Sequence, residues 1–319
     1  AGLTEIWSAP VVGDARHTAL GWAADEARAR TVALANPLSD EAPLMRISVL
    51  STMVDALVRN VARGARDVGL FEIGLVVARD GEQTSAPTED VGVQPSPEVL
   101  AAIHRAVPRQ PRHLAILLAG DRDRAGWWGE GRPADVSDVL GLVRSVADAL
   151  AVPVVLSGSA DVMPFHPGRC AAISLADGTL VGHAGELHPK VVAALGLPTR
   201  TVAAELDLDV LIAASEDPVA ARTLVTSPAA YTDLAVVVDE AVTAGSLEAS
   251  LGTGAGEMLE SITLFDVYRG DQVGPGRKSL AYRLAFRAPD RTLRTEEVSA
   301  LRDAALARAA ADLGATQRT

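Results

Sequence analysis

Apolar side chains along the first 215 residues recur in two kinds of pattern, one helical and one strand-like. Between residues 42 and 63 they return every three or four positions, which predicts an amphipathic helix. A second helix is predicted from Ser137, as its N-cap, to Leu150. Short apolar runs between Gly- and Pro-containing turns predict strands at 70–77, 114–118, 152–156, 170–175, 180–186 and 201–207. We therefore expect an α+β module with a mixed, mostly antiparallel sheet.

The C-terminal part of the chain shows a different order of elements. Strands are predicted at 234–238, 261–269 and 279–288, with helices at 246–253 and 296–313 and a short last strand. This βαββαβ order is typical of a ferredoxin-like domain, an architecture shared with RNA-recognition sheets. Alternation in the strand from Ser279 sends four large side chains to one face, namely Leu280, Tyr282, Leu284 and Phe286. Arginines and small residues remain on the other face, which leaves room there for a base or a phosphate.

Polar stretches separate these regions. Residues 80–98 are rich in Gly, Pro, Ser, Thr and acidic residues and predict a surface loop. The Ala-rich stretch that ends at Pro228 predicts a linker over residues 216–228. At 319 residues two domains are expected. We place the first at 1–215 and the second at 229–319.

Composition restricts the classes of function. Hydrophobic residues make up 48% of the chain and aromatic residues 3%, so the cores must consist mainly of Ala, Val and Leu. The formal net charge of −12 excludes nucleic-acid binding over the whole surface. Basic residues nevertheless concentrate within 26 positions, at Arg269, Arg277, Lys278, Arg283, Arg287, Arg291 and Arg294. A basic patch on an acidic domain suits a specific, weakly steered contact with RNA.

The single cysteine and the lack of long apolar stretches indicate where such a chain works. Cys170 cannot form an internal disulfide, and a small buried side chain is favoured over a reactive thiol. No apolar stretch approaches the roughly 20 residues that cross a bilayer. We expect a cytoplasmic protein. Because residues 1–6 run into apparent strand sequence without an initiator Met, we also expect a piece of a longer chain.

Three groups of motifs resemble the bacterial phenylalanyl-tRNA synthetase β subunit. The first group is NPLSD, MRISVL and LFEIG at 36–40, 45–50 and 70–74. The second is FHPGR and GHAGELHP at 165–169 and 182–189. The third is DLAVVV, LFDVYRG, GRKSL and APDRTL at 233–238, 264–270, 276–280 and 288–293. They follow the family's order over nearly the whole chain.

The resemblance implies a class II synthetase-like module without catalysis, followed by a ferredoxin-fold anticodon-binding domain. It implies an α2β2 enzyme that joins phenylalanine to its tRNA with ATP and magnesium, used on the α subunit. The implied partners are the α subunit and phenylalanine tRNA, without DNA or membrane, and no cofactor is expected on this chain. The family's oligonucleotide-binding-fold and editing domains have no counterpart among these residues, so no proofreading is expected of them.

The catalytic signatures of a class II synthetase are not found in the sequence. Such an enzyme needs arginines that bind the ATP phosphates, in an Arg-x-Glu motif and at the end of a Gly-rich strand. Glu72 stands at the first of these positions without the arginine, and no Gly-x-Gly…Arg follows. We therefore expect no catalytic residue in this chain.

Two further groups of residues were weighed for chemistry. His183, Glu186 and His188 could bind zinc, but a hairpin turn with solvated or backbone-bonded imidazoles is favoured, so no metal is expected. The helix stripe offers a subunit interface at Arg46, Leu50, Met53 and Leu57. The alternatives are a core stripe and an arginine that packs its stem near a helix start.

The expected tRNA contacts lie in the second domain, at Asp233, Tyr268, Arg269, Lys278, Arg283, Arg287 and Arg291. Tyr268 could stack on an anticodon base or lie partly buried at a strand end. One alternative function is a stand-alone pseudo-synthetase that acts as an interaction or assembly protein. Another is a small-molecule enzyme that uses the His183 group. Intact motifs at 265–269 and 289–293 favour the synthetase interpretation over the stand-alone pseudo-synthetase. The small-molecule enzyme is disfavoured because the His183 group has no matched partner group in the sequence.

Overall fold

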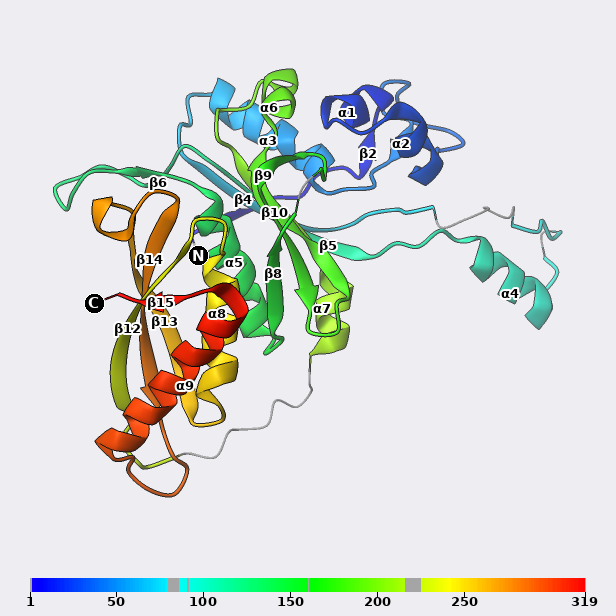
Figure 1. Ribbon diagram of the computed structural model, residues 1–319. Helices are drawn as coiled ribbons and strands as arrows, with labels where there is room; N and C mark the ends of the chain where they lie inside the picture. The colour runs from blue at the N-terminus through cyan, green and yellow to red at the C-terminus, as the bar shows by residue number, and fades with distance from the viewer. Residues whose placement is uncertain (1, 80–85, 91, 160, 216–224, 319) are drawn as a thin grey trace. The chain divides into compact units, whose positions relative to one another are not determined.

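The chain folds into two compact units, Ala1–Val219 and Ala220–Thr319. The structure is a computed structural model, and it describes residues 2–79, 86–90, 92–159, 161–215 and 225–318 (Figure 1). Most of the predicted linker, residues 216–224, lies outside the described residues. Each unit has its own sheet and hydrophobic core.

A seven-stranded sheet forms the centre of unit 1. Its strands, in spatial order, are β1 (Thr4–Glu5), β4 (Val68–Leu75), β5 (Arg112–Ala119), β11 (Val202–Asp207), β10 (Leu180–Leu187), β9 (Phe165–Leu175) and β8 (Val154–Gly158). Only β1 and β4 pair in parallel among these neighbours, which confirms the expected mixed, mostly antiparallel sheet.

Helices cover both faces of this sheet. Along β5 alternate residues point to opposite faces, so Leu117 meets the core under α3 (Leu50–Ala62). Ile116 instead meets the core under α5 (Val136–Ala149). The stripe of α3 is buried, as its periodicity predicts, and its largest fully buried side chains include Leu50, Met53 and Leu57.

Two predicted helix starts were wrong. The helix expected from residue 42 begins at Leu50, because Leu44–Met45 form β3, which pairs with β2 (Val11–Val12). The N-cap of α5 is Asp135 rather than Ser137. The Asp135 carboxylate accepts hydrogen bonds from the backbone of Ser137 and Asp138, and Asp138 completes a capping box.

Several short elements of unit 1 were not predicted. They are α1 (Asp14–Ala19), α2 (Ala24–Arg30), α4 (Pro97–Ala106), α6 (Pro189–Leu195), α7 (Leu208–Ala214) and the hairpin β6 (Asp121–Asp123) and β7 (Arg132–Pro133). The loop expected over 80–98 lies partly outside the described residues, and its last two positions belong to α4, which Ser96 caps. No helix within the described ranges is long and apolar enough to span a membrane.

Unit 2 has the predicted ferredoxin-like order. Its four-stranded antiparallel sheet runs β13 (Leu259–Tyr268), β14 (Arg277–Phe286), β12 (Ala230–Asp239) and β15 (Thr316–Gln317). The helices α8 (Ala244–Ala255) and α9 (Thr295–Leu313) pack on one face (Figure 1). A short 3-10 helix, Asp271–Val273, lies between β13 and β14. Tyr282 and Phe286 of β14 are fully buried under these helices, which confirms the predicted apolar face.

Candidate functional site

A closed polar network occupies the position where the class II motif is expected. Glu72 in β4 is fully buried, and its carboxylate accepts a 2.8 Å bond from Nη1 of Arg46. Ser8 donates to the other carboxylate oxygen at 2.6 Å. A Cβ at Gly74 would collide with the Arg46 guanidinium, which explains the glycine of the FEIG motif. With its charge neutralised inside the fold, Glu72 has no surface on which a nucleotide could bind.

The four residues expected at a subunit interface belong to the core. Arg46 and Leu50 are each 2% exposed, and Met53 and Leu57 are fully buried. The guanidinium of Arg46 also donates to the carbonyl of Leu75 and to the hydroxyl of Thr52. Because these side chains have almost no accessible surface, a direct contact with another subunit would require unit 1 to open. Their burial supports the core alternative, and a subunit-interface role for these residues stays a prediction.

A second, partly buried carboxylate caps α3. Glu205 reaches from β11 to the backbone N–H of Val49 at 2.9 Å, with a further bond from the Ser48 hydroxyl. His113 of β5 contacts the same carboxylate through Nδ1 at 2.8 Å. Burial would raise the pKa of Glu205, but the bonds from His113, Ser48 and Val49 outweigh it and lower that pKa. Burial likewise opposes the charge on His113, yet the hydrogen bond to Glu205 and the nearby carboxylates raise its pKa.

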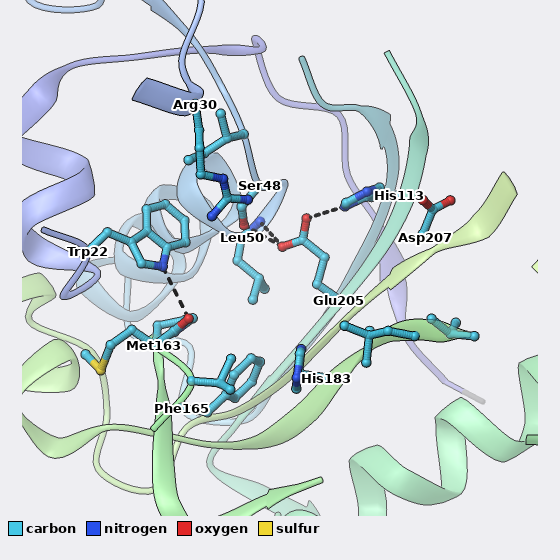
Figure 2. Close-up of a pocket in the computed structure, with 16 residues that line it drawn as sticks. Trp22, Arg30, Ser48, Leu50, His113, Met163, Phe165, His183, Glu205 and Asp207 are labelled. Atoms are coloured by element: carbon cyan, nitrogen blue, oxygen red, sulfur yellow. Dashed lines mark hydrogen bonds and ion pairs between the residues drawn. The ribbon is translucent and has the colours of Figure 1, made fainter. Parts of the chain in front are cut away.

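This pair lies beside a cavity of about 380 Å³ (Figure 2). Glu205 is in register with His183 of β10, so both side chains project from the face that α3 covers. Trp22 forms another wall, and its indole N–H donates to the carbonyl of Met163 at 3.2 Å. Arg30, at the end of α2, lines the opening. The cavity therefore collects side chains from elements that are far apart in sequence.

The candidate zinc group of the sequence is dispersed. His183 lines the cavity, and Glu186 instead pairs with Arg169 at 2.6 Å. His188 caps α6, because its Nδ1 accepts from the backbone N–H of Lys190. No cluster of three metal-ligating side chains occurs within the described ranges. His183 and Glu186 lie inside β10, which pairs antiparallel with β9, so the predicted hairpin is confirmed and the predicted turn was wrong for these two residues.

In unit 2, the sheet face opposite α8 and α9 is covered by no helix among the described residues and carries an arginine between an acid and an aromatic ring. Arg283 binds Asp233 through two bonds of 2.8 and 2.9 Å. The same guanidinium lies 5.6 Å from the ring centroid of Phe265. Phe265 is 55% exposed and Tyr231 is 67% exposed. These four side chains form what we call the open face.

Tyr268 is half-buried, and its ring faces a cation from the C-terminal strand region. The guanidinium carbon of Arg318 lies 4.4 Å from its centroid. Both alternatives for Tyr268 stay open, because a partly buried ring at a strand end can still present an edge or a face to a base. Arg269 nearby is paired with Glu240 at 2.9 Å.

The remaining basic residues of the predicted tRNA site have internal partners. Lys278 is 8% exposed and donates to the backbone carbonyl of Glu240. Arg287 binds Glu260 at 2.8 Å and also contacts the carbonyl of Ser227. Arg291 forms two bonds with Glu297 in the first turn of α9. Of the predicted residues, Asp233 and Arg283 are thus brought together on the open face, and Lys278 is largely removed from solvent.

The sequence analysis did not identify several residues of the cavity in unit 1 and of the open face in unit 2. It did not single out Arg30, His113 and Glu205 around the cavity, nor Phe265 and Tyr231 on the open face. A glutamate inside the buried run VAAELD was a usable signal, because an ionised side chain there needs partners. Phe265 could not be placed, because irregular pairing between Leu264 and Asp266 shifts the alternation of β13.

Comparison with known proteins gives two family matches. Residues 1–208 match the model described as the phenylalanyl tRNA synthetase beta chain CLM domain. Residues 226–318 match the ferredoxin-fold anticodon binding domain.

Curated relatives match over the full chain. The phenylalanine–tRNA ligase beta subunit of Thermobifida fusca is 48% identical over 99% of this chain and 38% of the relative. Those of Streptomyces avermitilis and Cutibacterium acnes are 47% and 44% identical over 100% of this chain and 38% of each relative. The chain therefore spans 38% of the length of these relatives.

Proposed function

Because this chain belongs to the phenylalanyl-tRNA synthetase β-chain family, we propose that it supports a catalytic α subunit and binds the anticodon end of phenylalanine tRNA. The proposed activity is that of an α2β2 phenylalanine–tRNA ligase, which consumes ATP with magnesium on the α subunit. This chain contributes binding and support, and its place is in the cytoplasm with the other components of protein synthesis.

The main support for tRNA binding is the open face of unit 2. It combines two exposed aromatic rings with an arginine on a sheet whose other face is closed by α8 and α9. Aromatic rings on an exposed sheet stack on single-stranded bases, and arginine binds phosphate or base edges. From residue 225 onward the unit has ten basic and thirteen acidic residues, so attraction of RNA must be local. Binding of a short single-stranded loop fits this distribution better than binding of a long duplex.

The absence of catalysis in this chain is part of the proposal. The buried Arg46–Glu72 pair supports it, because the charges at the class II motif neutralise each other. The same pair ties the segment before α3 to the central sheet, so unit 1 serves as a rigid body for docking. We propose that the α subunit docks on the surface of unit 1 and that Arg46, Leu50, Met53 and Leu57 support that surface from within.

Titration with phenylalanine tRNA at two salt concentrations, with and without a bacterial α subunit, tests this function. We expect binding that requires α and weakens as salt rises. If neither sample binds tRNA, the stand-alone interaction or assembly function is favoured instead. If the pure chain exchanges pyrophosphate with ATP in the presence of phenylalanine, the non-catalytic assignment is wrong.

A further inference from the structure

The cavity beside α3 contains hydrogen-bonding groups that the fold does not use. Glu205 is fully engaged by His113, Ser48 and the start of α3. By contrast, the guanidinium of Arg30 and the imidazole of His183 have no hydrogen-bond or ion-pair partner among the described residues. Figure 2 shows Arg30 and His183 on opposite sides of the space, with Trp22 between them at its edge.

These unused groups are mainly donors. Arg30 offers several N–H groups and cannot accept. His183 offers one N–H in its neutral form, and burial lowers the pKa of this histidine and so favours that form. Nδ1 of His113 is bound to Glu205, and its other ring nitrogen has no partner within the described ranges. A ligand group that accepts several hydrogen bonds would therefore provide partners for these donors.

We propose that this cavity binds a small monocarboxylate with an apolar or aromatic body. The carboxylate would meet Arg30, where a planar, two-oxygen acceptor matches the guanidinium. The body would lie against the apolar part of the wall, which is formed by Ile47, Leu50, Phe165, Val181 and Trp22. A volume of about 380 Å³ is within the range of small-molecule sites.

The charges around the cavity favour a singly charged ligand over a phosphate dianion. Glu205 and Asp207 provide two negative charges, opposed by Arg30 and by His113 in its charged form. Asp207 also caps α7 by accepting from the N–H of Val210 at 3.1 Å, which fixes the position of this carboxylate in the wall. A dianion would be repelled more strongly by the two nearby carboxylates. A monoanion needs only the guanidinium of Arg30 as its counter-charge.

Binding of phenylacetate to the full chain tests the proposal. We would follow heat by calorimetry and the indole N–H resonance of Trp22, assigned with Trp22→Phe, at constant ionic strength. We expect saturable binding in the millimolar range, with the Trp22 signal shifting in step. Arg30→Gln should weaken binding about tenfold or more. His183→Leu should weaken it by a smaller factor.

Two matched controls accompany this titration. Arg59→Gln removes another exposed arginine that is not in the cavity wall and should leave phenylacetate binding unchanged. Phenylethanol, which keeps the ring and lacks the charge, should bind much more weakly than phenylacetate. The proposal is overturned if phenylacetate does not bind saturably, if Arg30→Gln binds like the wild type, or if phenylethanol binds equally well.

Discussion

Nη1 of Arg46 lies 2.8 Å from the carboxylate of Glu72, and the two side chains are 3% and 0% exposed. The pair joins the segment before α3 to the second strand of the sheet. Low accessibility makes each charge dependent on the other, since neither can be solvated if its partner is lost. This dependence explains how a polar pair can be a structural element at the place where the sequence analysis looked for a class II catalytic motif.

Removal of Arg46 should therefore destabilise unit 1 strongly. We expect Arg46→Met to lower the free energy of unfolding by about 3–5 kcal/mol, because Glu72 is left buried without a counter-charge. Urea denaturation followed by circular dichroism measures this. The double variant Arg46→Met/Glu72→Met should be more stable than the single variant, since no buried charge remains.

An exposed ion pair provides the control. Arg28 and Asp14 are 3.0 Å apart, with side chains 70% and 53% exposed, so Arg28→Met should change stability little. If Arg46→Met were as mild as Arg28→Met, the structural importance of the buried pair would be refuted.

The pattern of apolar residues in the sequence predicted the longer helices and strands. The strands and helices of unit 2 were found in order, because β14 alternates over ten residues and α9 extends over 19 residues without a Gly or Pro. Helices of six or seven residues, such as α1 and α7, are too short to show a full apolar stripe. They were missed for that reason.

Contacts between distant residues could not be predicted. The start of α3 is capped by Glu205, which lies 156 positions after Val49. A search for a Ser, Thr or Asp beside the helix could not find this cap. In the same way, the position of Arg46 in the sequence does not indicate its partner Glu72. Nor does the clustering of seven basic residues in unit 2 indicate that most of them pair with acidic neighbours. Family motifs predicted the function where single residues did not.

The Glu205–His113 pair should make stability depend on pH. His113 has a raised pKa when folded, so its contribution is fully present below its ordinary value of 6.5 and is lost as pH rises through the folded value. Glu205 has a lowered pKa, so its contribution is fully present above its ordinary value of 4.5 and is lost as pH falls through the folded value. Both contributions are complete between pH 4.5 and 6.5.

Glu205→Gln should therefore be most damaging in that interval. We expect a loss of about 2 kcal/mol near pH 6, because a charge-assisted bond to His113 is replaced by a neutral one. The loss should shrink above the folded pKa of His113, where the wild type also loses its imidazolium. Denaturation at several pH values measures the difference, and a loss independent of pH would show that only the cap of α3 matters.

His17 should limit stability on the acid side. It is 1% exposed and both ring nitrogens lack a partner among the described residues. Burial lowers its pKa, partly opposed by Asp14 and assisted by Arg30. The unfolded chain therefore binds the proton more tightly, and stability falls as pH drops from 6.5 towards the folded value.

Replacement of His17 by Leu should reverse this effect. We expect a gain of about 1 kcal/mol at pH 7, since an unpaired buried polar group is removed, and a larger gain at pH 5.5. Thermal unfolding at both pH values is the measurement, with His104→Leu, an exposed histidine in α4, as the control. A gain that stays the same at the two pH values would argue against protonation of His17 as the cause.

The open face of unit 2 gives the sharpest test of tRNA binding. Phe265→Ala should weaken binding of phenylalanine tRNA to the reconstituted enzyme by about 1–3 kcal/mol if the ring stacks on a base. Arg283→Ala should weaken it too and should reduce the slope of binding against salt by about one. Neither change should unfold the domain, because both side chains are more than half exposed.

Arg308 is a matched control for Arg283. It lies in α9 on the covered side of the sheet, is 52% exposed against 57% for Arg283, and pairs with one aspartate, Asp312. Arg308→Ala should leave both tRNA affinity and its salt dependence unchanged. If Arg308→Ala weakened binding as much as Arg283→Ala, the effect would come from the overall charge of the unit. If neither variant had an effect, tRNA would have to contact another surface, and the open face would lose its proposed role.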